Sequence, residues 1–313
     1  AYNNLGNLYK ATDNLFDAIK CFEKAIELDV SSAVPYMNLR SLQLLLGNHV
    51  ESINTAIKGL DLGLDLEIYS NFYSGLLFEL NYCSHINIDY ANDLAKDFGL
   101  KLSSQCIPKF EHDFIEYDSN PFRKLRVGFV SADFREHHPV GIFTDGFLRQ
   151  IDKNSFEIIG FFNSTEDDFT LKLKPYFDDW FLIHGAKDIE VAKSISDANI
   201  DVLVDLSGHS AGNRLGVFAY KPAPVQVSWL GFFATTGLPE MDYFLGDPYL
   251  CTPEEQLNFT EKLYTLPDTW LSRLPPTDTV DVSALPALKN GFVTFGCFAN
   301  ISKLNDAVIS VFT

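Results

Sequence analysis

Residues 125–134 read LRVGFVSADF, a short run of apolar and β-branched residues that is typical of a buried strand. A helical pattern follows at 141–151, and FEIIGFFN at 156–163 repeats the strand pattern. Three further runs of the same kind come later: DVLVDLS at 201–207, APVQVSWLGFF at 223–233 and MDYFLGD at 241–247. This alternation of buried strands and helices predicts a parallel, doubly wound sheet in a Rossmann-like α/β domain over 125–285.

The sequence ahead of this domain contains an internal repeat. Shifted by 34 residues, it matches itself at Tyr2/Tyr36, Leu5/Leu39, Asn14/Asn48, Ile19/Ile53, Lys24/Lys58 and Leu28/Leu62. That period favours α-helical tetratricopeptide-type repeats over an ordinary helical hairpin for residues 1–64. We expect further helices over 65–106, joining the repeats to the α/β domain. The segment 107–124 contains two prolines and no clear period, so we predict a linker there.

The end of the chain resembles the beginning of another α/β unit. GFVTFGCFAN at 291–300 has the pattern of a strand, and ISKLNDAVISVF at 301–312 that of a helix. We therefore expect residues 286–313 to be a connector and the start of a second Rossmann-like domain. Because the chain starts and stops inside expected helices, we expect a fragment truncated at both ends.

The composition excludes several classes of protein. With 24 Lys and Arg against 42 Asp and Glu, the formal net charge is −18. Such a surface repels phosphate backbones and anionic lipids, so neither nucleic acid nor a membrane is an expected partner. The five cysteines are scattered, and no CxxC or zinc-like His/Cys spacing occurs. This pattern predicts reduced thiols in a cytoplasmic protein without a structural zinc site.

Two histidines follow the first expected strand. Open parallel sheets bind their ligands at the carboxyl ends of the strands, so these histidines are candidates for a site. His137 and His138 precede Pro139 in the sequence EHHP. A residue before proline favours an extended conformation, so the ring of His138 is expected to point out of the strand end. Two exposed loop histidines are the alternative interpretation.

A second polar segment, residues 204–215, contains the sequence Gly208-His209-Ser210-Ala211-Gly212 after an expected strand. It matches the G-x-S-x-G nucleophile elbow of α/β-hydrolases, in which the catalytic histidine follows the serine. The last histidine of this chain is His209, and no HGGG-type oxyanion segment is present. The pattern therefore favours a strand-end ligand loop over a serine hydrolase. Polar side chains are offered there by Asp205, Ser207, His209 and Ser210.

A third segment, FGCFANISKLND at 295–306, predicts a strand, a polar turn and a helix start with Lys303 beside it. A helix N-terminus with a nearby lysine suits an anionic oxygen. Neither a Walker A motif nor G-x-G-x-x-G occurs, so kinases and dinucleotide dehydrogenases would lack their phosphate loops.

The long segment 220–255, with YKPAPVQVSWLGFFATTGLPEMDYFLGD at its start, resembles the catalytic region of the O-linked N-acetylglucosamine transferases. This is glycosyltransferase family 41, which includes the SPINDLY-like proteins. The motifs that carry the resemblance are Leu76 to Tyr82, Leu125 to Phe134, His138-Pro139, Gly208 to Arg214, Lys221 to Gln226, Trp229 to Gly231, Thr235 to Gly237 and Met241 to Tyr243. The resemblance covers nearly the whole chain, repeats included.

The resemblance implies a GT-B architecture, in which two Rossmann-like domains face each other across a cleft. It implies inverting transfer of N-acetylglucosamine from UDP-GlcNAc to Ser or Thr of intracellular proteins, without a metal or another cofactor. The repeats would bind the acceptor proteins. His138 would orient the acceptor or relay its proton, and Lys303 would stabilise the leaving diphosphate. Near the nucleotide would lie Asn300, and the acceptor and sugar side would be lined by Asp205, Ser207, His209 and Ser210.

Departures from the family pattern leave alternatives open. Ile142 and Phe233 replace a common histidine and proline, and one extra residue before the H-P motif leaves His137 and His138 as rival site histidines. The donor could instead be GDP-fucose, as in SPINDLY-type O-fucosylation, or the protein could be a non-catalytic repeat scaffold. Because most of the second domain is missing, we expect no transfer by chain 1–313 alone.

Overall fold

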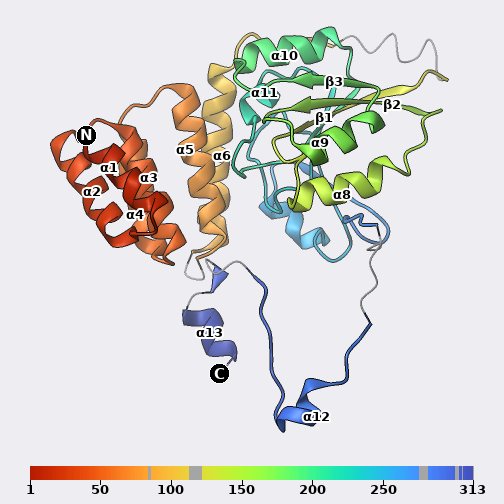
Figure 1. Ribbon diagram of the computed structural model, residues 1–313. Helices are drawn as coiled ribbons and strands as arrows, with labels where there is room; N and C mark the ends of the chain where they lie inside the picture. The colour runs from red at the N-terminus through yellow and green to blue at the C-terminus, as the bar shows by residue number, and fades with distance from the viewer. Residues whose placement is uncertain (84–85, 113–121, 275–280, 300–302, 305, 313) are drawn as a thin grey trace.

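The computed structural model describes residues 1–83, 86–112, 122–274, 281–299, 303–304 and 306–312. The N-terminal helices lie beside an α/β domain, and the C-terminal segment loops away to the short helix Pro286–Asn290 and then returns toward the lower ends of the helices Leu66–Leu80 and Ile88–Gln105 (Figure 1). Within the described residues, no helix is both long enough and apolar enough to cross a bilayer.

The N-terminal helices form two antiparallel pairs. They are α1 (Tyr2–Ala11), α2 (Leu15–Leu28), α3 (Ala33–Leu45) and α4 (His49–Leu60). The first pair closes on Phe22, and a Cβ atom on Gly6 would lie only 2.5 Å from that ring. The close approach of the two helices therefore requires a residue without a side chain at position 6. This arrangement confirms the predicted helical repeats at the level of fold.

The second pair departs from the repeat pattern because it packs a buried ion pair. Arg40 lies 3.1 Å from Glu79, through Nη1 and Oε1, and Ser52 donates to the other carboxylate oxygen at 2.7 Å. The guanidinium group fills the space in front of Gly75, where a Cβ atom would come within 2.2 Å of it. The arginine thus joins the repeat helices to the next helix along the chain.

Two longer helices, α5 (Leu66–Leu80) and α6 (Ile88–Gln105), connect the repeats to the sheet. Their side chains, such as Phe98 of α6, share one apolar core with Phe161 of the sheet and Tyr36 of the repeats. The helices predicted for residues 65–106 are therefore part of the core of the α/β domain and not a separate spacer.

Seven parallel strands form a single sheet in the order β3-β2-β1-β4-β5-β6-β7. They are β1 (Leu125–Ser131), β2 (Phe156–Phe162), β3 (Asp179–Leu182), β4 (Val202–Asp205), β5 (Val225–Trp229), β6 (Tyr243–Gly246) and β7 (Lys262–Thr265). The predicted parallel, doubly wound sheet is confirmed. The sequence analysis missed β3 and β7, which are four-residue edge strands with exposed positions and no continuous apolar run.

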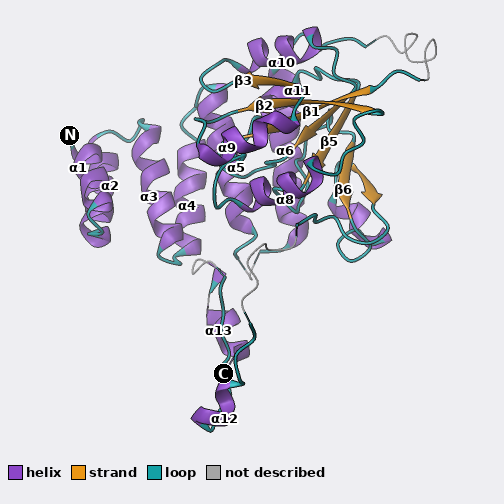
Figure 2. Cartoon of the chain, turned by 45° about the vertical axis from the view of Figure 1, so that its right-hand side comes forward, coloured by secondary structure: helices purple, strands orange, loops and turns teal. Residues whose placement is uncertain are grey.

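Alternating side chains of the strands feed two cores, one on each face of the sheet. In β2, Ile158 and Phe162 face one core, whereas Ile159 and Phe161 face the other. The first face is covered by α8 (Pro139–Leu148) and α9 (Asp168–Leu173), which is followed by the 3₁₀ turn η1 (Lys174–Tyr176). The opposite face is covered by α6, α10 (Asp188–Asp197) and α11 (Leu215–Ala219), whose side chains share one core. Figure 2 shows α10 and α8 on opposite sides of the strands. Both faces are buried, as expected for parallel strands.

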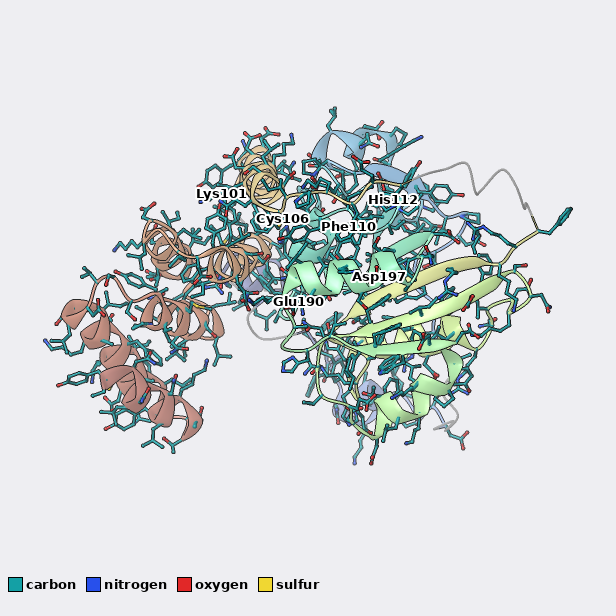
Figure 3. The ribbon with its side chains drawn as sticks, turned by 90° about the horizontal axis from the view of Figure 1, so that it is seen from above. Lys101, Cys106, Phe110, His112, Glu190 and Asp197 are labelled. Atoms are coloured by element: carbon teal, nitrogen blue, oxygen red, sulfur yellow. The ribbon has the colours of Figure 1, made fainter. Side chains whose placement is uncertain are left out.

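The first part of the predicted linker is held on the domain surface. The Phe110 N–H donates to the Tyr220 carbonyl at 3.0 Å, and His112 Nε2 lies 2.8 Å from the Lys221 carbonyl oxygen. Cys106, Phe110 and His112 follow one another from the end of α6 toward the sheet (Figure 3). The rest of the predicted linker includes 113–121, which lies outside the described residues.

The predicted strand at 291–300 is not present in its described part, 291–299. A strand needs a hydrogen-bonded neighbour, and this segment runs alone between the short helices α12 (Pro286–Asn290) and α13 (Asp306–Phe312) (Figure 1). Its apolar side chains are exposed, Phe295 and Phe298 among them. The prediction of a strand is therefore wrong for 291–299, because no strand of the described chain pairs with this apolar segment.

Candidate active site

A cavity of about 720 Å³ opens at the carboxyl end of the sheet. It lies beside β1 and β4, where connections leave to opposite sides of the sheet, the usual ligand position in open α/β folds. The loops after β1, β4 and β5 contribute to its wall, together with the end of α5. Its polar and aromatic lining includes His138, Ser210, Lys303, Asn81, Tyr82 and Phe233.

His138 is the histidine that faces this cavity. It precedes the first turn of α8 in an extended conformation, with φ −95° and ψ 130°, as the following proline predicts. Its Nε2 lies 3.6 Å from Asp133 Oδ1, and its buried Nδ1 has no hydrogen-bond partner among the described residues. The carboxylate favours a proton on Nε2, which leaves the Nδ1 lone pair free. Burial lowers the pKa of His138 more than Asp133 raises it, so the ring is neutral at pH 7.

His137 does not take part in the cavity. Its backbone has a φ of +61°, and its side chain is 91% exposed, compared with 34% for His138. The extra residue in the turn is therefore accommodated by a left-handed residue that points into solvent. This placement favours His138 over its neighbour as the site histidine.

Asp205 and Ser207 lie beneath the cavity wall instead of lining it. The carboxylate of Asp205 is fully buried and accepts the backbone N–H groups of Ser207 at 3.1 Å and Gly208 at 2.7 Å. Burial raises the pKa of Asp205 to about 7, although these two donors act in the opposite direction. The expectation that both residues line the sugar side is corrected: their polar groups shape the turn after β4.

His209 is also turned away from the larger cavity. Its Nδ1 lies 3.0 Å from Ser74 Oγ and its Nε2 lies 3.1 Å from the Thr236 carbonyl oxygen. The carbonyl requires a donor, so the proton is on Nε2 and Nδ1 accepts from the serine. Phe98 and Phe232 contact the ring edge-on from two sides. His209 is a buried histidine held by these contacts; contrary to the prediction, it does not line the cavity of His138 but borders a smaller neighbouring cavity.

This environment makes a testable prediction about pH. Burial lowers the pKa of His209 to about 3, so the stability it provides is complete above pH 6.5 and is lost as the pH falls toward 3. We expect the stability advantage of the native protein over His209→Asn to shrink by about 2 kcal/mol between pH 7 and pH 5. Urea unfolding at both pH values measures this difference. His137→Asn, an exposed control, should show no such change, and an unchanged gap for His209→Asn would contradict the assignment.

Ser210 is the member of the second motif that reaches the cavity. Its buried Oγ has no hydrogen-bond partner within the described part of the chain. The adjacent His209 has both ring nitrogens engaged, so it does not activate this serine. The arrangement is therefore that of a ligand-binding hydroxyl and not of a hydrolase nucleophile.

A tight turn at the end of β5 forms the next part of the wall. Leu230 has a φ of +75°, and the Gly231 N–H donates to the Trp229 carbonyl at 2.9 Å. A Cβ atom on Gly231 would come within 1.9 Å of the Leu206 carbonyl oxygen. The W-L-G motif thus brings the backbones after β4 and β5 into contact, and the chain then presents Phe232 and Phe233 to the cavity.

The end of α5 supplies residues that the sequence analysis did not assign to the site. Phe78, Asn81, Tyr82 and Cys83 all line the cavity. Phe78 contacts Tyr82 and Phe232, with ring centroids 5.4 and 6.2 Å apart. The signal in the sequence was the motif Leu76 to Tyr82, one of those that carry the family resemblance.

Lys303 completes the wall from the C-terminal segment, in which it is exposed. It therefore lies at the same cavity as His138, 165 positions earlier in the chain. Asn300, expected near a nucleotide, lies outside the described residues. In the part of the chain that the structure describes, no group of three or more His, Cys, Asp or Glu side chains is arranged to hold a metal ion.

Fold and site together define a helical-repeat protein joined to a Rossmann-like domain with a ligand cavity at its switch point. The family model for glycosyl transferase family 41 matches residues 95–273, and the chain belongs to this family. The match includes the loops after β1, β4 and β5.

Relatives and solved structures agree with this assignment. The SPINDLY protein of Arabidopsis thaliana, named a probable UDP-N-acetylglucosamine–peptide N-acetylglucosaminyltransferase, is 32% identical over 242 residues, covering 75% of this chain and 26% of the relative. The similarly named protein of Caenorhabditis elegans is 30% identical over 152 residues, which cover 47% of this chain and 13% of that relative. A mutant O-GlcNAc transferase of Thermobaculum terrenum superposes with a TM-score of 0.87 at 31% identity, covering 99% of this chain and 58% of that one. The chain thus spans about a quarter of the length of the SPINDLY relatives it matches.

Proposed function

We propose that this chain is part of a protein O-glycosyltransferase that transfers N-acetylglucosamine from UDP-GlcNAc to Ser or Thr hydroxyls with inversion. The observation that carries the proposal is the single cavity that collects His138, Ser210 and Lys303 from three distant segments. Membership of family 41 and the names of the relatives support the same reaction.

The reaction joins the acceptor hydroxyl oxygen to the anomeric carbon of the sugar. The oxygen attacks on the face opposite the diphosphate, and the bond from that carbon to the diphosphate breaks with its electron pair leaving on the nucleotide. The acceptor hydroxyl loses its proton as the new bond forms. His138 is suited to accept that proton or to orient the hydroxyl, because its ring is neutral at pH 7 and Nδ1 is unpartnered. Ser210 Oγ is available to hydrogen-bond the sugar or the acceptor.

Lys303 would serve the other side of the reaction. Negative charge develops on the diphosphate as the glycosidic bond breaks, and a fixed ammonium group lowers the energy of that state. The proposal assigns this charge stabilisation to Lys303, so it requires no metal ion or other cofactor. Asn300, three positions earlier, would contribute a polar group to the nucleotide side.

The lysine assignment predicts a large kinetic effect. In the complete encoded polypeptide, Lys303→Ala should lower kcat for transfer by about 100- to 1,000-fold, because a charge-stabilising group is lost from the transition state. Transfer of radiolabelled sugar to an acceptor protein measures it. Lys289→Ala, an exposed lysine of α12, is the matched control and should keep full activity. Equal rates in both variants would remove Lys303 from the reaction.

A donor comparison tests the function itself. UDP-GlcNAc and GDP-fucose are each offered to the complete polypeptide with the same acceptor proteins, and product sugar is identified by mass spectrometry. Transfer from UDP-GlcNAc supports the proposal, whereas transfer only from GDP-fucose assigns the alternative SPINDLY-type O-fucosylation. Absence of transfer from both donors would favour a non-catalytic repeat scaffold. Chain 1–313 alone is expected to be inactive.

We also propose that the acceptors are intracellular proteins bound through the repeat helices, and that the protein is cytoplasmic. Unpaired thiols support a reducing location: Cys21, Cys83, Cys106, Cys251 and Cys297 are all free. The net charge of −18 supports protein acceptors over nucleic acid.

A further inference from the structure

A second, smaller cavity of about 370 Å³ lies next to the candidate active site. It is bounded by α5, the start of α6, the loop after β5 and the 3₁₀ turn η2 (Pro253–Asn258). Asn81, Phe232 and Phe233 line both cavities, so only a thin wall of side chains separates them. We propose that this cavity binds an arginine or lysine side chain of the acceptor polypeptide, a few residues from the glycosylated Ser or Thr. This inference rests on the proposed function.

The walls of the cavity are aromatic and partly exposed. Its lining includes Phe232, Phe233, Phe244, Tyr249 and Phe259. Phe233 is 57% exposed and Tyr249 is 85% exposed, so these rings have faces that remain open to a ligand. Flat aromatic faces bind guanidinium and ammonium groups and also pack on their aliphatic stems. Phe233, which departs from the family pattern, belongs to this wall.

One side of the cavity carries a carboxylate whose position is fixed. Asn92 Nδ2 donates to Asn258 Oδ1 at 2.9 Å, and Asn258 Nδ2 donates to Glu255 Oε2 at 2.8 Å. This chain of bonds links α6 to η2 and holds the Glu255 side chain against the cavity. A carboxylate fixed in advance loses little conformational entropy when a cation binds to it.

Charge and polarity favour a cationic occupant over an apolar one. Among the described lining residues there is no lysine or arginine, while Asp89, Asp93 and Glu254 are exposed nearby on α6 and η2. An apolar side chain in this space would shield the Glu255 carboxylate from water, and the bond from Asn258 replaces only part of its hydration, which is unfavourable. A guanidinium group satisfies the carboxylate and stacks on the rings at the same time.

Continuity with the candidate active site identifies the cation as part of the acceptor. Both cavities open along the carboxyl edge of the same sheet, beside β4 and β5. An extended polypeptide advances about 3.3 Å per residue. Because the two cavities share Asn81, Phe232 and Phe233 as a wall, a hydroxyl in the larger cavity and a basic side chain in the smaller one would be only a few residues apart.

Peptide binding to chain 1–313 tests this inference without any donor. Fluorescent peptides contain one serine and one arginine, placed one to four residues away on either side, and each is paired with a citrulline peptide of nearly the same shape. Anisotropy titrations measure Kd. We expect about tenfold tighter binding of arginine over citrulline at one or more of these positions, and loss of that preference in Glu255→Gln. Glu254→Gln, an exposed neighbour outside the cavity, should keep it.

Three results would overturn the inference. They are equal affinity for arginine and citrulline peptides at every position, a preference that survives Glu255→Gln, and no saturable binding of any arginine peptide up to about 1 mM. The wild-type comparison needs no variant, so a folding defect cannot obscure it. Because binding is measured without sugar transfer, failure of the proposed function in the donor assay is a separate result. If arginine peptides bind preferentially but no sugar is transferred, the result contradicts the proposed glycosyl transfer and still supports the cation site.

Discussion

Replacing His138 by alanine is expected to lower the rate of glycosyl transfer by about 100- to 10,000-fold in the complete encoded polypeptide. The physical reason is the geometry of the imidazole. Its Nε2 faces the buried Asp133 carboxylate at 3.6 Å, and its buried Nδ1 has no hydrogen-bond partner among the described residues. Removing the ring takes away the only histidine among the described residues that line this cavity.

The measurement is kcat and KM for sugar transfer, compared with those of His137→Ala. His137 is adjacent in sequence and 91% exposed, so its loss should leave both constants unchanged. A general base should affect kcat more than KM, and the acidic limb of the pH profile should disappear in His138→Ala. A lower kcat in His137→Ala, together with a normal kcat in His138→Ala, would assign the site histidine to position 137 instead.

Gly237→Ala is expected to destabilise the protein by about 4 kcal/mol or more. Gly237 has a φ of +74°, and an added Cβ atom would lie 1.9 Å from the Ala95 carbonyl oxygen of α6. The contact is reciprocal, because a Cβ atom on Gly99 would lie 1.9 Å from the Gly237 carbonyl oxygen. Two stretches of backbone touch here, and neither can move aside as a flexible side chain does.

Urea unfolding of the variant measures the loss, and Gly185→Ala separates its two causes. Gly185 has a similar φ of +79° but no atom within 4 Å of an added Cβ. That control should lose only the backbone strain of about 1–2 kcal/mol. Equal losses at the two positions would show that the contact between α6 and the loop after β5 contributes nothing.

The contact at Gly237 also bears on function. The T-T-G turn follows Phe233, which lines both cavities, and α6 carries Asn92 of the polar chain that reaches Glu255. The same close approach of backbones that stabilises the domain therefore fixes the distance between the two sides of the smaller cavity. A variant here should alter peptide binding even where the protein still folds.

The sequence by itself determined the architecture. The apolar runs beginning at Leu125 and Phe156 became neighbouring parallel strands. Continuous apolar runs of this kind are typical of parallel sheets, whose strands are buried on both faces. The 34-residue period became two helix pairs, the first closed by the small residue Gly6 against Phe22 and the second adapted to Arg40 at the corresponding position. Motifs that follow strands, as at His138 and Ser210, necessarily met at one edge, because parallel strands all end on the same side.

Only the tertiary structure decided which polar groups reach a ligand. His209 and Ser210 are adjacent in sequence, yet one is bound by Ser74 and Thr236 and the other opens into the cavity. Local sequence carries no information about partners 135 and 27 residues away. The segment 291–299 shows the same limit, because an apolar run becomes a strand only when another strand pairs with it. Patterns along a chain report burial and period, whereas contacts between distant segments assign the site.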